Sequence, residues 1–186
     1  SGKIRSAMSG HNKWSKIKHQ KGIADARKST TFSKLSKQIN IAARNGGGDP
    51  SMNPSLALLV EKAKAANMPK DTIEKAIKKG TGELKDDSAE IMEIVYEGYG
   101  PFGVALIIKT LTDNKNRTVA EIRNILERFG GSMGTLGSAS YIFDKQNVPS
   151  FLVPLDEDQY SKVLELIETL EDHDDVVEVY ANHSKA

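Results

Sequence analysis

The sequence contains no cysteine. This excludes disulfides, thiolate nucleophiles and cysteine-ligated zinc, and it fits a reducing compartment, so we expect a cytoplasmic protein. No run of 18 apolar residues occurs, so we expect no membrane-spanning helix. The sequence also lacks a GxxxxGK(S/T) phosphate loop and a GxSxG nucleophile elbow. We therefore expect no enzymatic activity, no cofactor and no bound metal.

Charged residues are divided unevenly along the chain of 186 residues, although its formal net charge is only +1. Residues 1–80 contain 17 Lys and Arg against 5 Asp and Glu, whereas residues 81–186 contain 9 against 20. This asymmetry predicts a basic half that faces a polyanion and an acidic half that repels one. The alternative is that the two halves simply attract each other.

The basic residues are concentrated in an N-terminal arm and the first predicted helix. Nine of them lie between Met8 and Gly48, against one acid, Asp25. Lysine and arginine neutralise phosphates, and an interleaved aromatic ring can stack on a base or a sugar. The nucleic-acid-binding candidates are Lys13, Trp14, Lys16, Lys18, His19, Lys21, Arg27, Lys28, Lys34, Lys37 and Arg44. The alternative is a solvated basic helix, with Trp14 only holding the arm against the helical domain.

The first part of the chain is predicted to be helical. Residues 1–7 precede Met8 and are interpreted as a non-native remnant, and residues 8–82 as a basic arm followed by a three-helix domain. Helices are expected over residues 24–44, from Asn53-Pro54 onwards, and from Pro69 to Lys79, with Gly80 ending the third. Lys34 and Lys37 lie off the apolar stripe of the first helix, so we expect both to face solvent.

From residue 89 to residue 186 the hydrophobic period changes and predicts an α/β domain. Strands are expected at 91–96, 104–110, 138–143 and 176–180, and helices at 118–129 and 156–170. The order β-β-α-β-α-β is typical of a ferredoxin-like sandwich, with helices on one face of a mainly antiparallel sheet. The predicted fold class is therefore α+β with more than one domain.

Three motifs could mark sites, but each favours a structural role. The glycines of Asn45–Pro50 are interpreted as a helix stop, with close approach to a phosphate as the alternative. The run Gly130–Gly137 follows a helix, whereas a dinucleotide loop follows a strand, so we reject nucleotide binding there. Glu171–Asp175 (EDHDD) is interpreted as a solvated acidic turn, because consecutive side chains diverge and do not surround one ion.

Six blocks of the sequence together carry a specific resemblance. They are His11–His19 (HNKWSKIKH), Ala42–Pro50 (AARNGGGDP), Lys62–Asp71 (KAKAANMPKD), Ile77–Gly82 (IKKGTG), Tyr96–Pro101 (YEGYGP) and Leu170–Val176 (LEDHDDV). The chain closely resembles the YebC/PmpR family over Met8 to about Tyr180. The resemblance implies a bacterial DNA-binding protein of the kind described as a probable transcriptional regulator. Mitochondrial relatives are translational activators, and bacterial members are also tied to stalled ribosomes.

The resemblance also implies a YebC-like fold with an N-terminal helical domain and two α/β domains, the third inserted within the second. Here the chain departs from the family, because Phe143–Val148 runs directly into Pro149–Asp156. We expect the inserted domain to be absent near residues 148–149, either deleted in this protein or missing from the sequence as given. Any function that needs the cleft between the second and third domains is then in doubt.

The leading hypothesis is a monomeric transcriptional regulator that binds DNA through its basic N-terminal region. A ribosome- or ribosomal-RNA-associated translation factor is the alternative. The Gly46–Asn53 connection is too long for a helix-turn-helix motif, which favours recognition of shape and backbone over bases. A protein-interaction adaptor is a further alternative, which would dock a basic partner from the ribosome or the transcription machinery. Its acidic surface would comprise Asp156, Glu157, Asp158, Glu165, Glu168 and Glu171.

Overall fold

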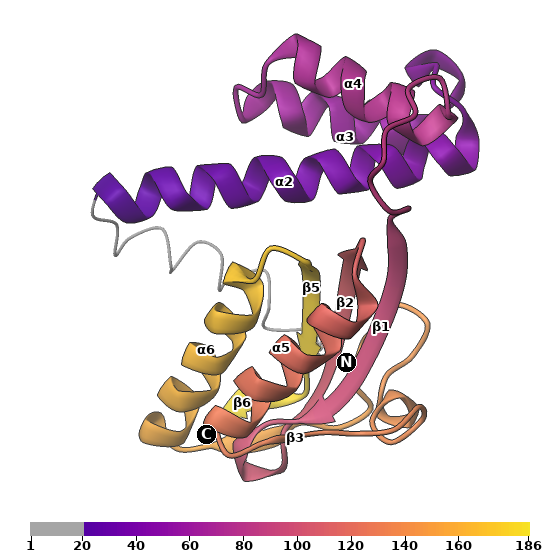
Figure 1. Cartoon of the computed structure of the whole chain (residues 1–186). Helices are drawn as coiled ribbons and strands as arrows, with labels where there is room; N and C mark the ends of the chain where they lie inside the picture. The colour runs from indigo at the N-terminus through magenta and orange to yellow at the C-terminus, as the bar shows by residue number, and fades with distance from the viewer. Residues whose placement is uncertain (1–20) are drawn as a thin grey trace. The chain divides into compact units, whose positions relative to one another are not determined.

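The computed structural model describes residues 21–186, with side chains from Thr30 onwards. Within this range the chain forms two compact units (Figure 1). The helical unit comprises Gly22–Met92 and Leu111–Asn114, and the α/β unit comprises Glu93–Thr110 and Lys115–Ala186. No helix among residues 21–186 is long and apolar enough to cross a membrane. The predicted α+β, multi-domain class is confirmed.

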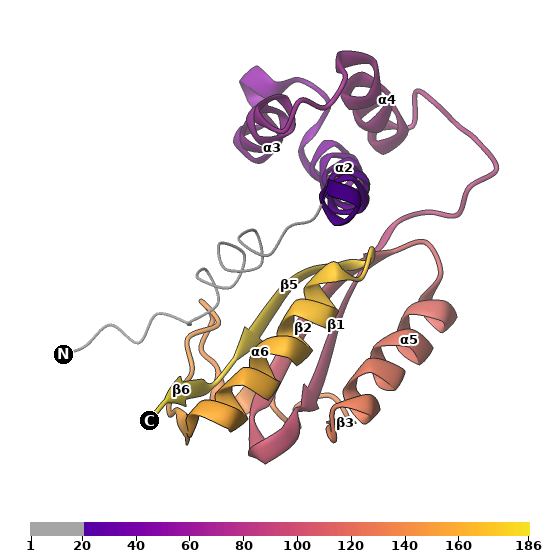
Figure 2. The same ribbon diagram turned by 90° about the vertical axis from the view of Figure 1, so that its left-hand side faces the viewer.

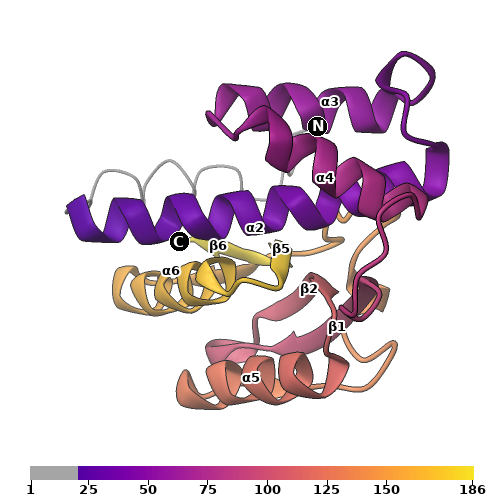
Figure 3. The same ribbon diagram turned by 45° about the horizontal axis from the view of Figure 1, so that its top comes forward.

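The helical unit contains the three predicted helices, α2 (Lys21–Gly46), α3 (Pro54–Ala65) and α4 (Lys70–Thr81). A short 3-10 turn, η3 (Pro50–Met52), precedes α3. Figure 3 shows α3 and α4 on the same side of α2. Their shared core is formed by Leu35, Ile39, Ala43, Leu56, Ala63, Met68, Ile73 and Ala76. The apolar faces that the 3.6-residue period predicts for these helices are therefore the faces that pack against one another.

Asn53 joins the end of α2 to the start of α3. Its side-chain oxygen accepts the Leu56 N–H at 3.2 Å, and its amide donates to the carbonyls of Ala42 at 2.9 Å and Gly47 at 2.8 Å. Gly47 has a φ of 91°, a left-handed conformation that suits glycine at a helix end. The interpretation of Asn45–Pro50 as a helix stop is therefore confirmed, since Asn53 holds this turn from within the unit.

Gly80 has a different role from the predicted one. It lies inside α4, and the left-handed residue that ends the helix is Gly82, with a φ of 82°. A Cβ atom on Gly80 would lie 2.3 Å from the backbone oxygen of Asn40 in α2. Glycine at position 80 is therefore a packing requirement, because it lets the two helix backbones approach closely.

The α/β unit is built on a four-stranded sheet in the order β3-β1-β2-β5. The strands are β1 (Met92–Tyr99), β2 (Ala105–Thr112), β3 (Ser132–Met133) and β5 (Val176–Ala181), and the β1–β3 and β2–β5 pairs are antiparallel. Helices α5 (Lys115–Arg128) and α6 (Glu157–Asp172) lie against this sheet (Figure 2). Side chains of both helices join one core with Leu106, Ile108 and Val179, so both cover the same face, as predicted.

A second, parallel pair of short strands, β4 (Val153–Leu155) and β6 (His183–Lys185), was not predicted. The helix predicted at 156–170 begins with the capping box of Asp156 and Gln159.

The prediction of a strand at residues 138–143 is wrong. This segment contains a 3-10 turn, η5 (Ser140–Ile142), and packs Ala139 and Ile142 against Ala105 and Ile107. The cause is Glu97 in β1, whose carboxylate accepts the backbone N–H groups of Gly137, Ala139 and Ser140 at 2.6 to 3.1 Å. Three donors needed for a ladder are thus used by one side chain, and the fourth strand of the sheet is supplied by β3 and not by this segment.

Candidate nucleic-acid interface

The structure describes only some of the residues that were predicted to bind nucleic acid. Lys13, Trp14, Lys16, Lys18 and His19 lie outside the described residues. Lys21, Arg27 and Lys28 lie in α2, whose backbone is described over their positions. Side chains are described for Lys34, Lys37 and Arg44.

Lys34 and Lys37 were both predicted to face solvent, but each is partly buried in the structure. Lys37 lines a groove together with residues of α4. Arg44, in the last turn of α2, is exposed. Its guanidinium donates to the backbone oxygen of Ile91 at 2.7 Å and forms an ion pair with Glu90 at 3.3 Å.

Several lysines outside the predicted set extend the positive surface of the helical unit. None of them was a predicted site residue: Lys62, Lys64, Lys75 and Lys78 counted only toward the total charge of residues 1–80, and Lys85 lies just after that range. Those that are exposed and have no ion pair within the described part of the chain are Lys62, Lys64, Lys75, Lys78 and Lys85. Residues 30–82 hold nine Lys and Arg against four Asp and Glu, so α2 to α4 carry a net positive charge. The recurring lysines of α4 are the sequence feature that could have predicted this additional positive surface.

A groove of about 770 Å³ lies between α2, α4 and the linker that follows α4. The basic residues that line it are Lys37, Arg44, Lys75, Lys79 and Lys85. Gly80 also lines it, so the close α2–α4 contact that this glycine allows fixes the spacing of the two basic helices. A groove with cations on both walls attracts phosphates more strongly than the same charges scattered over a convex surface.

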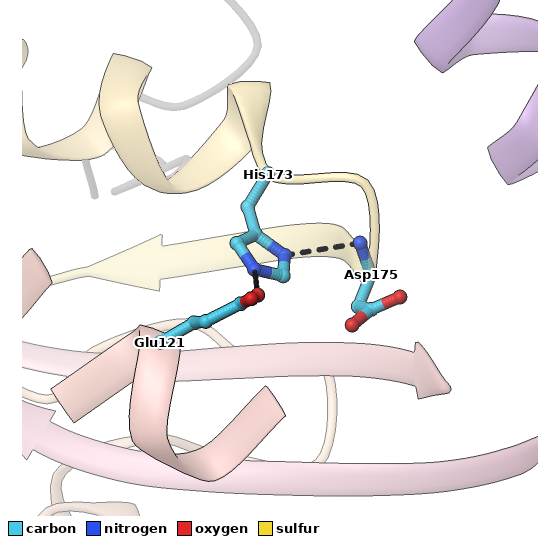
Figure 4. Close-up of side chains that lie close together, drawn as sticks. All are labelled: Glu121, His173 and Asp175. Atoms are coloured by element: carbon cyan, nitrogen blue, oxygen red, sulfur yellow. Dashed lines mark hydrogen bonds and ion pairs between the residues drawn. The ribbon is translucent and has the colours of Figure 1, made fainter. Parts of the chain in front are cut away.

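Among the residues that the structure describes, the α/β unit contains one cluster that resembles a metal site, formed by Glu121, His173 and Asp175 (Figure 4). Nε2 of His173 lies 2.5 Å from a Glu121 oxygen, and Nδ1 accepts the Asp175 N–H at 3.1 Å. Because Nδ1 is an acceptor, Nε2 carries the proton and donates it to Glu121. Both ring nitrogens of His173 are therefore engaged in hydrogen bonds within the protein.

The interpretation of residues 171–175 as a solvated turn is wrong for Asp175, which is buried. It is only 1% exposed, and its carboxylate accepts the Thr118 hydroxyl at 2.7 Å and Arg117 Nη2 at 3.1 Å. The contacts connect the start of α5 with the segment between α6 and β5. Sequence spacing gives no sign of them, because Glu121 and His173 are 52 residues apart. This cluster acts as a structural clamp.

Comparisons with known proteins match both units. The family model described as TACO1/YebC protein N-terminal domain matches residues 12–83, and the one described as TACO1/YebC second and third domain matches residues 91–152. A protein of Trichlorobacter lovleyi named "Probable transcriptional regulatory protein" is 51% identical over 179 residues, which cover 95% of this chain and 72% of that protein. The chain belongs to the TACO1/YebC family.

Two further relatives extend this assignment. The crystal structure of a conserved hypothetical protein of Aquifex aeolicus has a TM-score of 0.80 at 32% identity, and the match covers 91% of this chain and 96% of that chain. A "Probable transcriptional regulatory protein" of Dictyoglomus turgidum is 40% identical over 239 positions, covering 94% of this chain and 95% of its own length. Since 239 exceeds the 186 residues of this chain, the alignment contains gaps in it.

The predicted position of the missing TACO1/YebC insertion forms a closed turn. Asp144 Oδ1 accepts the N–H groups of Gln146 at 2.9 Å and Val148 at 2.8 Å, and Ser150 donates to the Ile142 oxygen at 2.8 Å. The turn therefore satisfies its own backbone groups. That the insertion belongs between residues 148 and 149 stays a prediction.

Proposed function

We propose that this protein is a regulatory nucleic-acid-binding protein that contacts phosphates through the basic residues of its arm and helical unit. The observation that carries the proposal is the groove between α2 and α4, whose walls present lysines and an arginine from two helices. The names of the relatives, probable transcriptional regulatory proteins, favour DNA as the first ligand to test. The proposal includes phosphate contacts by the basic residues from Lys13 to Lys28.

The exposed lysines support the proposal in a specific way. If the protein's own carboxylates neutralised every cation, no positive surface would remain for phosphates. Instead, Lys75, Lys78 and Lys85 are exposed and make no ion pair within the described residues. Each lysine that reaches a phosphate releases condensed counterions, which is the main source of affinity for duplex DNA.

The connection between α3 and α4 bears on the choice of nucleic acid. The sequence shows no helix-turn-helix signature, and its connection between α2 and α3 is too long for the tight turn of that motif. α3 ends at Ala65 and α4 begins at Lys70, so four residues join them. Helix-turn-helix motifs have turns of similar length, and their second helix enters the major groove. Helix bundles commonly contain connections of this length, so the turn permits such an arrangement but does not by itself select duplex DNA over ribosomal RNA.

The test is a titration of labelled random-sequence duplex DNA at several salt concentrations, read by fluorescence anisotropy. If six phosphates are contacted, log K should fall with log salt at a slope of about −5. The variant with Lys75, Lys78 and Lys85 changed to Glu should bind more weakly to every sequence, with a slope smaller by about 3. The arm variant with Lys16, Lys18 and Lys21 changed to Glu should behave in the same way.

A matched control separates contact from total charge. Lys115, Lys145 and Lys162 are exposed lysines of the α/β unit, and changing them to Glu alters the net charge equally. We expect the control to retain the wild-type slope. Equal weakening in all three variants would refute the assigned surface. A preference for ribosomes over duplex DNA of more than about tenfold at one salt concentration would instead favour the translational alternative.

A further inference from the structure

The linker after α4 is the most acidic segment of the helical unit. Residues 83–90 contain four Asp and Glu against one lysine, and all eight residues are exposed. Yet this segment does not extend away from the basic helices. Leu84, Asp86, Ser88 and Glu90 line the same groove as the lysines of α2 and α4. An acidic segment of the chain therefore follows the surface on which phosphates are proposed to bind.

Two of its carboxylates are paired with cations of the groove. Asp86 Oδ2 lies 2.8 Å from Lys79 Nζ, and Glu90 Oε1 lies 3.3 Å from Arg44 Nη1. A second nitrogen of the same guanidinium donates to the Ile91 backbone oxygen at 2.7 Å. The linker thus fixes one cation from α4 and one from α2, on opposite walls of the groove.

The geometry of Asp86 favours its charged form. Lys79 donates to its carboxylate, and Ser88 donates both its hydroxyl and its backbone N–H, the latter at 3.0 Å. These hydrogen bonds, first that of Lys79, hold the pKa of Asp86 well below its ordinary value. Asp86 is therefore an anion throughout the physiological pH range, as a phosphate diester is.

The contacts are nevertheless ones that an external anion can replace. The side chains of Glu90 and Asp86 are 76% and 41% exposed, and those of Arg44 and Lys79 are 31% and 33% exposed. Ion pairs at this degree of exposure contribute little to folding stability and weaken further as salt rises. A polyanion that places several phosphates in the groove also releases its condensed counterions, a gain that the linker carboxylates do not provide.

We propose that the acidic linker is a built-in competitor for nucleic acid, in which Asp86 and Glu90 occupy Lys79 and Arg44 until phosphates displace them. This inference rests on the proposed function, because it assigns a regulatory element to the same groove. The linker lowers affinity for weak or short polyanions, which meet too few cations to displace it. A longer or better-matched nucleic acid opens the linker and gains two phosphate contacts.

The decisive comparison uses two double variants with the same change in net charge. In Asp86→Asn, Glu90→Gln the two paired carboxylates are removed. In Glu83→Gln, Asp87→Asn two neighbouring acids are removed, which are exposed and have no hydrogen bond or ion pair within the described residues. All four positions are on the surface, so both variants should fold, and far-ultraviolet circular dichroism checks this.

The paired-acid variant should bind random duplex DNA about threefold more tightly than the control variant at the same salt concentration. Its salt slope should stay close to that of the wild type, because duplex DNA displaces the linker in the wild type and contacts Lys79 and Arg44 in both proteins. The control variant should keep the wild-type slope. Equal affinity in the two variants would overturn the inference, since the acids would then act only through net charge.

Hydrogen exchange gives an independent readout on the wild-type protein. Adding duplex DNA should speed exchange of the backbone amides of residues 84–90, including the Ser88 N–H that Asp86 accepts. Slower or unchanged exchange in the bound protein would overturn the competitor role. If the wild type binds no nucleic acid at any salt concentration, the proposed function itself fails. Binding with an unmoved linker refutes only the present inference.

Discussion

Replacing Glu97 with glutamine tests how one buried carboxylate organises the second face of the sheet. Glu97 is 4% exposed, and it accepts the backbone N–H groups of Gly137 at 2.7 Å, Ala139 at 3.1 Å and Ser140 at 2.6 Å. These bonds hold the loop that covers Ala105 and Ile107. Glutamine has nearly the same shape, so the substitution removes the charge and one acceptor without opening a cavity.

The expected loss follows from these three bonds. A hydrogen bond to a charged group contributes about 1.5–3 kcal/mol, against about 1 kcal/mol for a neutral one. After the substitution, the remaining side-chain oxygen would still accept from Ala139 and Ser140, but the new amide nitrogen would face the Gly137 N–H, donor against donor. We expect the free energy of unfolding to fall by about 3 kcal/mol, which corresponds to a decrease in Tm of about 15 °C for a unit of this size.

The effect should depend on pH with a definite sign. Burial raises the pKa of Glu97, but the hydrogen bonds from Gly137, Ala139 and Ser140 outweigh burial and lower it below its ordinary value of 4.5. A carboxyl whose pKa is lowered in the folded state stabilises the fold above its unfolded pKa. That stabilisation is lost as pH falls through the folded pKa. The wild type should therefore exceed Glu97→Gln in stability above about pH 5, and the difference should shrink in more acidic solution.

The measurement is thermal or urea unfolding followed by tyrosine circular dichroism in the near ultraviolet. All five tyrosines lie within residues 93–186, so the tyrosine signal reports the α/β unit. Glu93→Gln is the matched control, because Glu93 is exposed on the same strand. Wild-type stability in Glu97→Gln at pH 7, or an equal loss in the control, would refute the reasoning.

Two further substitutions test packing and the clamp. Gly80→Ala should destabilise the helical unit by about 2 kcal/mol despite the better helix propensity of alanine, because the new Cβ would lie 2.3 Å from the Asn40 oxygen. Thermal unfolding followed at 222 nm checks this, and a variant as stable as the exposed control Thr81→Ala contradicts it. Asp175→Ala should lower the stability of the α/β unit by about 3 kcal/mol, since it removes the acceptor of the buried Thr118 hydroxyl. Urea unfolding tests this, and a midpoint unchanged from the wild type argues against the clamp.

The elements with strong periodicity were predictable from the sequence. α2, α3 and α4 begin or end at residues with local signals, such as Asn53 before Pro54 and the glycines after Asn45. The α+β class and the packing of both helices on one sheet face also follow from local patterns, because amphipathic helices and β-branched runs each bury one side. These features depend on neighbours within a few residues, which the sequence displays directly.

The features that were missed depend on distant residues. The segment 138–143 has strand composition, but Glu97, some 40 residues earlier, takes its N–H groups. Gly80 resembles a helix end in the sequence, because its contact with Asn40 exists only after α2 and α4 pack. The groove likewise combines Arg44 and Lys79, which no local spacing relates. For the candidate site, composition therefore predicts the sign of the charge but not its arrangement.

The linker also changes how the charge asymmetry should be understood. By composition, the basic part of the sequence ends near residue 80, whereas the helical unit extends to Met92. The acids of residues 83–90 therefore belong to the basic unit in space, although they belong to the acidic half in sequence. Acids that served only solubility would have no reason to contact the cations of the groove. Asp86 and Glu90 instead lie on cations from two different helices, which is the arrangement expected of an internal substitute for phosphate.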